Sequence, residues 1–253
     1  NGSVDGSKEY LLNQDDCDVY ESRGDFKSAN SGIYWKNVII ERNKDATWVL
    51  SVDIDELAVY DGWPELTIDD FASHCSDASL SAVTALMLDM YSFDPLLEGK
   101  NPQDSTDLIN DFPYFDGTGY RKFTHHHWRR NKFPRQIIEG GPSKRLSSGK
   151  NANWLAKTPF LLKQNIYFLD PHTVVPIDFN FSKPLIALLH FRFTGELSEK
   201  IKKVQNQGYS DGSVKIYKMF GSHLENARSF SLKYEFSERF TMPKQLVDKG
   251  LLA

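Results

Sequence analysis

Three carboxylates in one short stretch are the residues of this sequence best suited to chemistry. Asp53, Asp55 and Glu56 follow an apolar run, WVLSV at residues 48–52, that has the length and composition of a strand buried on both faces. Ligands of open α/β sheets bind beyond the carboxyl ends of strands, and carboxylates bind Mg²⁺ or Mn²⁺, which in turn hold phosphate oxygens. An acidic surface turn is the alternative, because short acidic motifs often match by chance.

Basic side chains elsewhere in the chain could meet an anionic ligand. The glycine-rich stretch GGPSKRLSSGK is predicted to be a flexible loop, and its Lys144 and Arg145 could bind anionic oxygens or simply be solvated. The apolar run PLIALLHFRF carries His190 and Arg192 on one face of a predicted strand. A lone histidine in such a run is usually a hydrogen-bonded core residue, but two polar side chains on one face favour a functional role.

The hydrophobic periodicity predicts the elements that would position these side chains. Predicted helices cover residues 8–13, 31–44, 67–74, 197–208 and 214–226, and predicted strands cover 17–20, 48–52, 79–91, 120–130, 154–164, 167–175 and 184–193. Thr67 and Asp70 have the spacing of a helix capping box. This order predicts a doubly wound α/β sheet, and the long segment 92–119 is either a mobile cover over the crevice or a static excursion held by its aromatic residues.

Composition narrows the class of protein. The chain has 253 residues, a formal charge of −4 and a pI near 6.0, which argues against a dedicated nucleic-acid binder. Cys17 and Cys75 are too few for a disulfide scaffold, and no run approaches the ~20 apolar residues of a membrane span. We therefore expect a cytoplasmic protein, with peripheral association at the inner membrane left open.

Several motifs, in this order along the chain, give the sequence a family resemblance. They are NGSVDGS at 1–7, WVLSVDIDE at 48–56, GGPSKRL at 140–146, LAKTP at 155–159 and LLHFR at 188–192. The chain thereby resembles glycosyltransferases of the GT-A type, in a bacterial branch of the family-2 group. The resemblance covers about residues 1–195 and implies a Rossmann-like, doubly wound mixed sheet whose first β-α unit is missing before residue 1. Residues 196–253 would form a C-terminal helical extension.

The resemblance also implies an activity. A sugar would pass from a nucleotide diphosphate donor, most simply a UDP-sugar, to a hydroxyl of a saccharide or glycoconjugate acceptor, in the synthesis of surface polysaccharides or glycoconjugates. A Mn²⁺ or Mg²⁺ ion would be held by Asp53, Asp55 and His190. The donor would be contacted by residues of four different segments, namely Asp5, Asp53, Lys144, Arg145 and Arg192, whose cations would offset charge on the leaving diphosphate.

Direct displacement at the sugar would also require a base to remove the acceptor proton. Three carboxylates are candidates: Glu139, Asp116 and Asp89. Glu139 ranks first because it precedes Gly140 and Gly141, which would allow the backbone to approach a substrate closely. For each of the three, an ordinary surface carboxylate is the alternative.

Two other functions remain open at this point. The string DIDEL resembles the first strand of haloacid-dehalogenase phosphatases, in which the first aspartate is the nucleophile. Glu56 stands where those enzymes have glycine, and no later pair of aspartates completes the motif. The other alternative is a non-catalytic module of the same fold that binds carbohydrate or protein, since 13% of the residues are aromatic and could stack on sugars.

Overall fold

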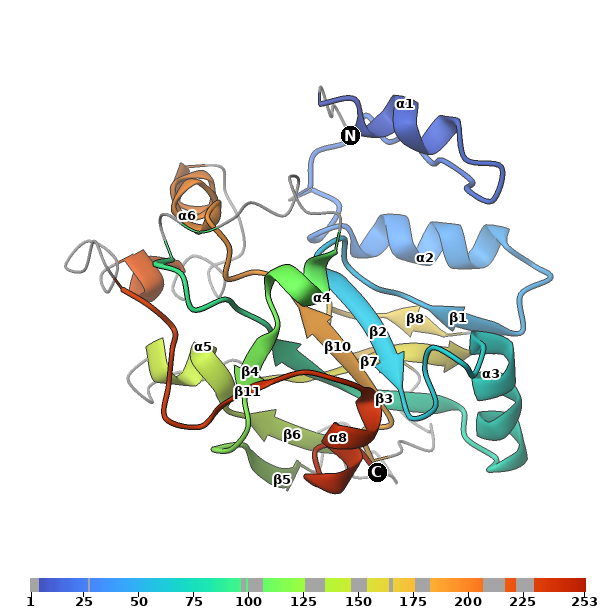
Figure 1. The fold of residues 1–253 in the computed structure, drawn as a ribbon. Helices are drawn as coiled ribbons and strands as arrows, with labels where there is room; N and C mark the ends of the chain where they lie inside the picture. Colours follow the sequence, from blue (N-terminus) through green and yellow to red (C-terminus); the bar gives the residue numbers. More distant parts are fainter. Residues whose placement is uncertain are drawn as a thin grey trace.

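A mixed five-stranded sheet forms the centre of the protein (Figure 1). The computed structural model describes residues 5–26, 28–96, 99, 107–125, 135–146, 154–163, 166–175, 183–206, 217–221 and 230–253. In spatial order the strands are β1 (Trp48–Leu50), β7 (Ala156–Leu162), β3 (Ala82–Asp89), β10 (Ile186–His190) and β2 (Glu56–Tyr60). Strands β3 and β10 are parallel and the other neighbours are antiparallel. The predicted α/β class, a mixed sheet flanked by helices, is confirmed.

Three two-stranded sheets surround the central sheet. They pair β4 (Tyr114–Asp116) with β11 (Ser237–Arg239), β5 (Arg121–His125) with β6 (Arg135–Glu139), and β8 (Tyr167–Phe168) with β9 (Val174–Val175). The single strand predicted at 167–175 is therefore a hairpin, and residues 17–20 form no strand. The strand predicted at 120–130 is described only as far as His125, so the adjacent histidines that follow lie outside the described residues.

Helices cover both faces of the central sheet. Consecutive strand residues point to opposite faces, and Phe160 packs with Phe71 of α3 (Ile68–Asp77), whereas the next residue, Leu161, packs with Ile33 of α2 (Ile33–Arg42). Helices α2 and α3 thus lie on opposite sides of the central sheet. Helix α1 (Ser7–Leu12) lies beyond α2, on the side away from the sheet in Figure 1.

Asp53, Asp55 and Glu56 form the acidic cluster of the sequence. The two helices on either side of it along the chain form where the sequence predicts them. Helix α3 begins at the predicted capping box: the Thr67 hydroxyl accepts from the Asp70 N–H, and the Asp70 carboxylate accepts from the Thr67 N–H. Helix α2 falls inside the predicted range 31–44. The helices later in the chain include α4 (Leu108–Asp111), α6 (Leu197–Asn206) and α8 (Pro243–Asp248).

The stretch WVLSVDIDE differs from the prediction of one buried strand. Only Trp48–Leu50 forms a strand, it lies at an edge of the sheet, and all three of its residues are half-buried. Residues 51–55 form an irregular link, and Glu56 begins β2 at the opposite edge. The apolar run was too short to settle whether its strand is central or at an edge, because periodicity does not report sheet position.

Two segments predicted as loops are more ordered than expected, at least in part. The basic stretch at 140–150 forms helix α5 (Gly141–Leu146), whose Pro142, Ser143 and Leu146 are buried, and residues 147–150 lie outside the described residues. In segment 92–119, Phe112 and Phe115 are buried in the main core, which fixes its second half in place. The part of the predicted mobile cover at residues 97–98 and 100–106 lies outside the described residues.

The end of the chain completes the main core. Leu246, Leu251 and Leu252 are buried against the central sheet, and the Ala253 N–H donates to the main-chain oxygen of Pro184 just before β10. Strand β11 adds to β4 beside them. Within the described part of the chain, no helix has the length and apolar character needed to cross a membrane.

Candidate functional site

Strand register assembles a row of ionisable side chains at one end of the central sheet. His190 ends β10 and lies opposite Asp89 at the end of the parallel strand β3 and opposite Glu56 at the start of the antiparallel strand β2. The link before β2 is tied to the same end, because the Phe191 N–H donates to the Asp55 main-chain oxygen. Asp55 and Glu56 therefore lie beside the carboxyl end of β10.

Asp89 is a buried carboxylate with every oxygen engaged. Its Oδ1 lies 3.1 Å from His190 Nδ1, and its Oδ2 accepts from Arg192 Nη2 at 3.0 Å and from the Ser143 hydroxyl. Burial raises the pKa of Asp89, but Arg192, His190 and Ser143 outweigh burial and hold the pKa well below its usual range. Asp89 is therefore ionised at neutral pH.

His190 lies between two carboxylates. Its Nδ1 faces Asp89, and its Nε2 lies 3.6 Å from Asp55 Oδ2, so the predicted proximity of His190 and Asp55 is confirmed. The histidine side chain is buried, whereas that of Asp55 is 25% exposed. Burial lowers the pKa of His190, but the hydrogen-bonding carboxylates of Asp55 and Asp89 outweigh it and raise the pKa above its ordinary value. The imidazole connects the solvent-facing carboxylate to the buried one.

Asp55 also meets a lysine from the C-terminal part of the chain. Lys200, on α6, places its Nζ 3.0 Å from Asp55 Oδ2. Burial raises the pKa of Asp55, but His190 and Lys200 lower it further than burial raises it, so the carboxylate is ionised. Residues 196–253, expected to be a separate extension, thus contribute a residue to this site.

A buried lysine holds the other half of the acidic cluster. Lys157 on β7 is 3% exposed and lies 2.8 Å from Asp53 Oδ2 and 2.8 Å from both oxygens of Glu56. Lys36 on α2 contacts the other oxygen of Asp53 at 2.8 Å. Burial raises the pKa of Asp53, but the two lysines together lower it to about 2. Glu56 and Lys157 therefore act as a buried anchor for the link that carries Asp53 and Asp55.

A cleft of about 680 Å³ opens beside this cluster, between α2 and α6. Asp53, Lys36 and Lys200 lie on its wall, together with the aromatic side chains of Trp35 and Tyr217. Two other lining residues, Asn30 and Ser31, have positive φ values of 50° and 58°, a strained conformation for residues other than glycine that concentrates at functional sites. The cleft thus combines aromatic surface with charged side chains of both signs.

The carboxylates and the histidine of this site are the candidate ligands for a divalent cation. Among the described residues no group of three or more His, Cys, Asp or Glu side chains is arranged to hold a metal ion. Asp55 and His190 alone fit: their 3.6 Å separation falls between the ~3 Å and ~4 Å expected for adjacent and opposite ligands with bonds of ~2.1 Å. Asp53 is directed to Lys157 and Lys36 instead. Within the described residues, a cation between Asp55 and His190 would have two protein ligands, and its other positions would be taken by water or a bound ligand.

Two residues predicted to contact the donor take other partners. The Arg192 guanidinium donates to Asp89 and is buried behind His190. Arg145 makes a two-point contact with Asp116, at 2.8 and 2.9 Å, and packs over the ring of Tyr234. Neither guanidinium faces the cleft beside Asp53.

The three candidate bases differ in environment. Asp89 and Asp116 are buried and paired with arginines, whereas Glu139 is 22% exposed and lies 3.1 Å from Lys144. The two glycines after Glu139 do permit a close approach, but to Tyr120: a Cβ on Gly140 would lie 2.7 Å from the Tyr120 ring.

Asp5, the remaining residue predicted to contact the donor, takes a local partner. Asp5 is exposed, and its Oδ1 accepts from the main-chain N–H and the hydroxyl of Ser7 at the start of α1.

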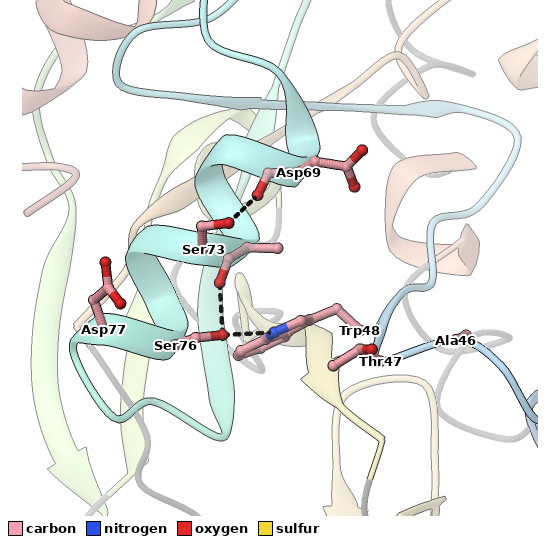
Figure 2. A pocket seen from close by; sticks show the side chains of 8 residues that line it. Ala46, Thr47, Trp48, Asp69, Ser73, Ser76 and Asp77 are labelled. Carbon is pink, nitrogen blue, oxygen red and sulfur yellow. Dashed lines mark hydrogen bonds between the residues drawn. The ribbon is translucent and has the colours of Figure 1, made fainter.

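A second hollow lies between β1 and α3 (Figure 2), where the Trp48 indole donates to the Ser76 hydroxyl. The hydroxyls of Ser73 and Ser76 both donate to carbonyls of α3 and are therefore not available to donate to a ligand.

Sequence reasoning missed three residues of the site. Lys157, Lys200 and Ser143 were assigned no role, although each contacts one of the predicted carboxylates. Lys157 carried a usable signal, since a lysine within a buried strand requires a carboxylate partner. Lys200 and Ser143 lie on helices whose position relative to the cluster depends on tertiary packing.

No protein-family model, curated protein or solved structure matches this chain. The assignment of a function therefore depends on the residues and geometry described above.

Proposed function

We propose that this protein is a glycosyltransferase of the GT-A type that uses a nucleotide diphosphate sugar and Mn²⁺ or Mg²⁺. The observation that carries the proposal is the pairing of Asp55 with His190 at the end of the sheet, beside a cleft large enough for a nucleotide. Two protein ligands leave most of the shell of a hard cation to other oxygens, and a diphosphate supplies them. When bound, the cation would neutralise charge on the leaving diphosphate.

The chain's own residues take the following roles in this proposal. Asp55 and His190 hold the cation, and Lys200 moves from Asp55 to a phosphate oxygen when the donor enters. Lys36 and Asp53 line the cleft that receives the nucleoside, where Trp35 supplies an aromatic surface. These residues orient the diphosphate and fix the direction in which it leaves.

The acceptor base is assigned to Glu139. It is the most exposed of the three candidate carboxylates, and it ends β6 directly before Gly140 and Gly141, where a Cβ placed on Gly141 would lie 3.8 Å from Asp89 Oδ2. Proton removal requires a carboxylate that an acceptor hydroxyl can reach, and Asp89 and Asp116 are both enclosed and paired with arginines. The acceptor itself would be a saccharide or glycoconjugate.

A phosphatase of the haloacid-dehalogenase type is less well supported. Its nucleophile would be Asp53, whose two oxygens are each bound by a lysine. Glu56, which stands where those enzymes have glycine, is bound by the buried Lys157. A non-catalytic binding module would also use the cleft, but it would not need Asp55 and His190 to lie close together.

Thermal unfolding with nucleotide sugars tests the proposal. UDP-glucose, UDP-galactose and GDP-mannose are each added with and without Mn²⁺, and release of the nucleoside diphosphate is followed in parallel. At 100 times its dissociation constant a ligand stabilises by ~2.7 kcal/mol, which raises the midpoint by roughly 5–10 °C for a chain of this size. We expect such a shift for one donor, only with Mn²⁺, and its loss in Asp55→Asn.

Other outcomes separate the alternatives. A shift without release of diphosphate, in the presence of varied saccharide acceptors, favours the binding module. Hydrolysis of p-nitrophenyl phosphate that is lost in Asp53→Asn favours the phosphatase. No cation-dependent shift with any donor contradicts the proposal.

A further inference from the structure

The carboxylate of Asp89 has two oxygens with different neighbours. Oδ1 faces His190 Nδ1 at 3.1 Å, while Oδ2 is surrounded by donors, Arg192 Nη2 and the Ser143 hydroxyl. The side chain is fully buried, so no exchange with solvent competes for these contacts. The orientation of the carboxylate is fixed by a guanidinium on one side and an imidazole on the other.

This arrangement decides which nitrogen of His190 carries a proton. An ionised carboxylate only accepts hydrogen bonds, so Nδ1 must be the donor to Asp89. The other nitrogen, Nε2, then faces Asp55 Oδ2 at 3.6 Å. When Nε2 is also protonated it points toward Asp55, and a bound cation would take the place of that proton.

We propose that Asp89 is a positioning residue: it keeps the proton of His190 on Nδ1 and thereby reserves Nε2 as the ligand that faces Asp55. The inference rests on the proposed function, in which Asp55 and His190 hold a divalent cation, and it assigns Asp89 to the imidazole rather than to the acceptor. A carboxylate behind a ligating histidine fixes the ring and its tautomer, and loss of such a group typically costs 10- to 100-fold in metal affinity.

The structure predicts an informative result for Asp89→Asn. Arg192 and Ser143 are both donors, so the amide oxygen of the new side chain would take the place of Oδ2. The amide NH₂ would then face Nδ1 and donate to it. His190 would be forced into the opposite tautomer, with its proton on Nε2 and no lone pair directed at Asp55.

Asp116→Asn is the matched control. Asp116 is as deeply buried as Asp89, it is also paired with an arginine, and the substitution makes the same change of charge. Asp116 has no contact with His190 among the described residues; its partners are Arg145 and Tyr91. A general effect of losing a buried carboxylate would appear in both variants, whereas an effect on the tautomer would appear in only one.

Two measurements separate this inference from the proposed function. Long-range ¹H–¹⁵N NMR of the metal-free protein reports which ring nitrogen of His190 is protonated. Calorimetry of Mn²⁺ in the presence of UDP reports the affinity of the cation. We expect a proton on Nδ1 in the wild type and in Asp116→Asn, a proton on Nε2 alone in Asp89→Asn, and a Mn²⁺ affinity at least 10-fold weaker only in Asp89→Asn.

The inference is overturned if Nδ1 of wild-type His190 carries no proton, a result that does not depend on any variant folding. It is also overturned if Asp89→Asn keeps the wild-type tautomer or if both variants lose the same affinity. Absence of Mn²⁺ binding in the wild type, with the expected tautomers observed, contradicts the proposed function and leaves Asp89 as the residue that orients His190.

Discussion

Two buried aspartates of this protein are each paired with an arginine, and they differ in what lies behind the pair. Asp89 and Arg192 adjoin His190, which reaches Asp55 at the surface. Asp116 and Arg145 adjoin Tyr91, whose hydroxyl donates to Asp116 at 2.7 Å. The residue types and charges are the same in the two pairs, and both aspartates are buried, although Arg145 is 27% exposed and Arg192 only 8%.

The difference lies in the direction of each network. The contacts of Asp89 lead through His190 to Asp55, beside the cleft. Those of Asp116 lead to the C-terminal segment: Arg145 donates to the Leu232 main-chain oxygen, and Tyr91 also contacts Ser237. We therefore interpret the Asp116 pair as a clamp that fixes the end of the chain, and the Asp89 pair as support for a site. The same pair of residue types serves stability in one place and positioning in the other.

The largest expected effect is on the clamp. Arg145→Met would leave the Asp116 carboxylate buried without its cation, which costs about 3–5 kcal/mol of unfolding free energy. Urea unfolding measures this loss. Arg239→Met is the control, because the side chain of that exposed arginine donates to the neutral side chain of Asn110, and we expect a change within about 0.5 kcal/mol. Equal losses in the two variants would contradict the clamp.

A smaller loss is expected at the anchor of the acidic link. Lys157→Met removes the cation between Glu56 and Asp53, and Glu56 is fully buried, so we expect a loss of about 3 kcal/mol. Unlike the clamp variant, this one should also weaken binding of a cation with UDP, because the link that carries Asp55 loses its support. Urea unfolding and calorimetry together distinguish the two regions, and unchanged binding would show that Lys157 serves stability alone.

Lys200 should affect binding more than stability. Its side chain is 44% exposed, so Lys200→Ala is expected to change the unfolding free energy by less than about 1 kcal/mol. Without UDP, Mn²⁺ should bind about two- to fivefold more tightly, since a competing cation at Asp55 is removed, an effect of the same size as an exposed ion pair. With UDP, binding should weaken. A parallel change in both titrations would contradict the role given to Lys200.

The smallest effect is a pH dependence at Asp53. Its pKa falls from 3.8 to about 2 on folding, mainly because Lys157 and Lys36 outweigh burial. A lowered pKa stabilises the folded state above the unfolded value, and this stabilisation is lost as the pH falls from about 4 toward about 2. The stability difference between wild type and Asp53→Asn should therefore shrink over that range, from a value below about 1 kcal/mol because Asp53 is partly exposed. A constant difference would contradict this assignment.

Local signals in the sequence predicted much of the fold. The capping box at Thr67 and the continuous apolar runs of β3 and β10 were sufficient, because each depends on neighbouring residues. The edge position of Trp48–Leu50 and the helix at Gly141–Leu146 were not predicted, because both depend on which surfaces meet in the folded chain. Periodicity reports which residues are buried and not what covers them.

The sequence predicted part of the site and not the rest. His190 and Asp55 do lie close together, but Asp55 reaches this place just before the start of β2, which is antiparallel to β10, and not at the end of the strand expected before it. The partners of Arg145 and Arg192 could not be foreseen, since a guanidinium meets a buried carboxylate as readily as a phosphate. Only the packed structure decides between the two.

Calorimetry of Mn²⁺ with and without UDP tests the central claim most directly. Asp55 and His190 supply two ligands, so the cation should bind weakly alone and at least 10-fold more tightly when a diphosphate supplies further oxygens. His190→Ala should remove most of this gain. Equal Mn²⁺ affinity in the two titrations, or a gain that persists without His190, would contradict the account.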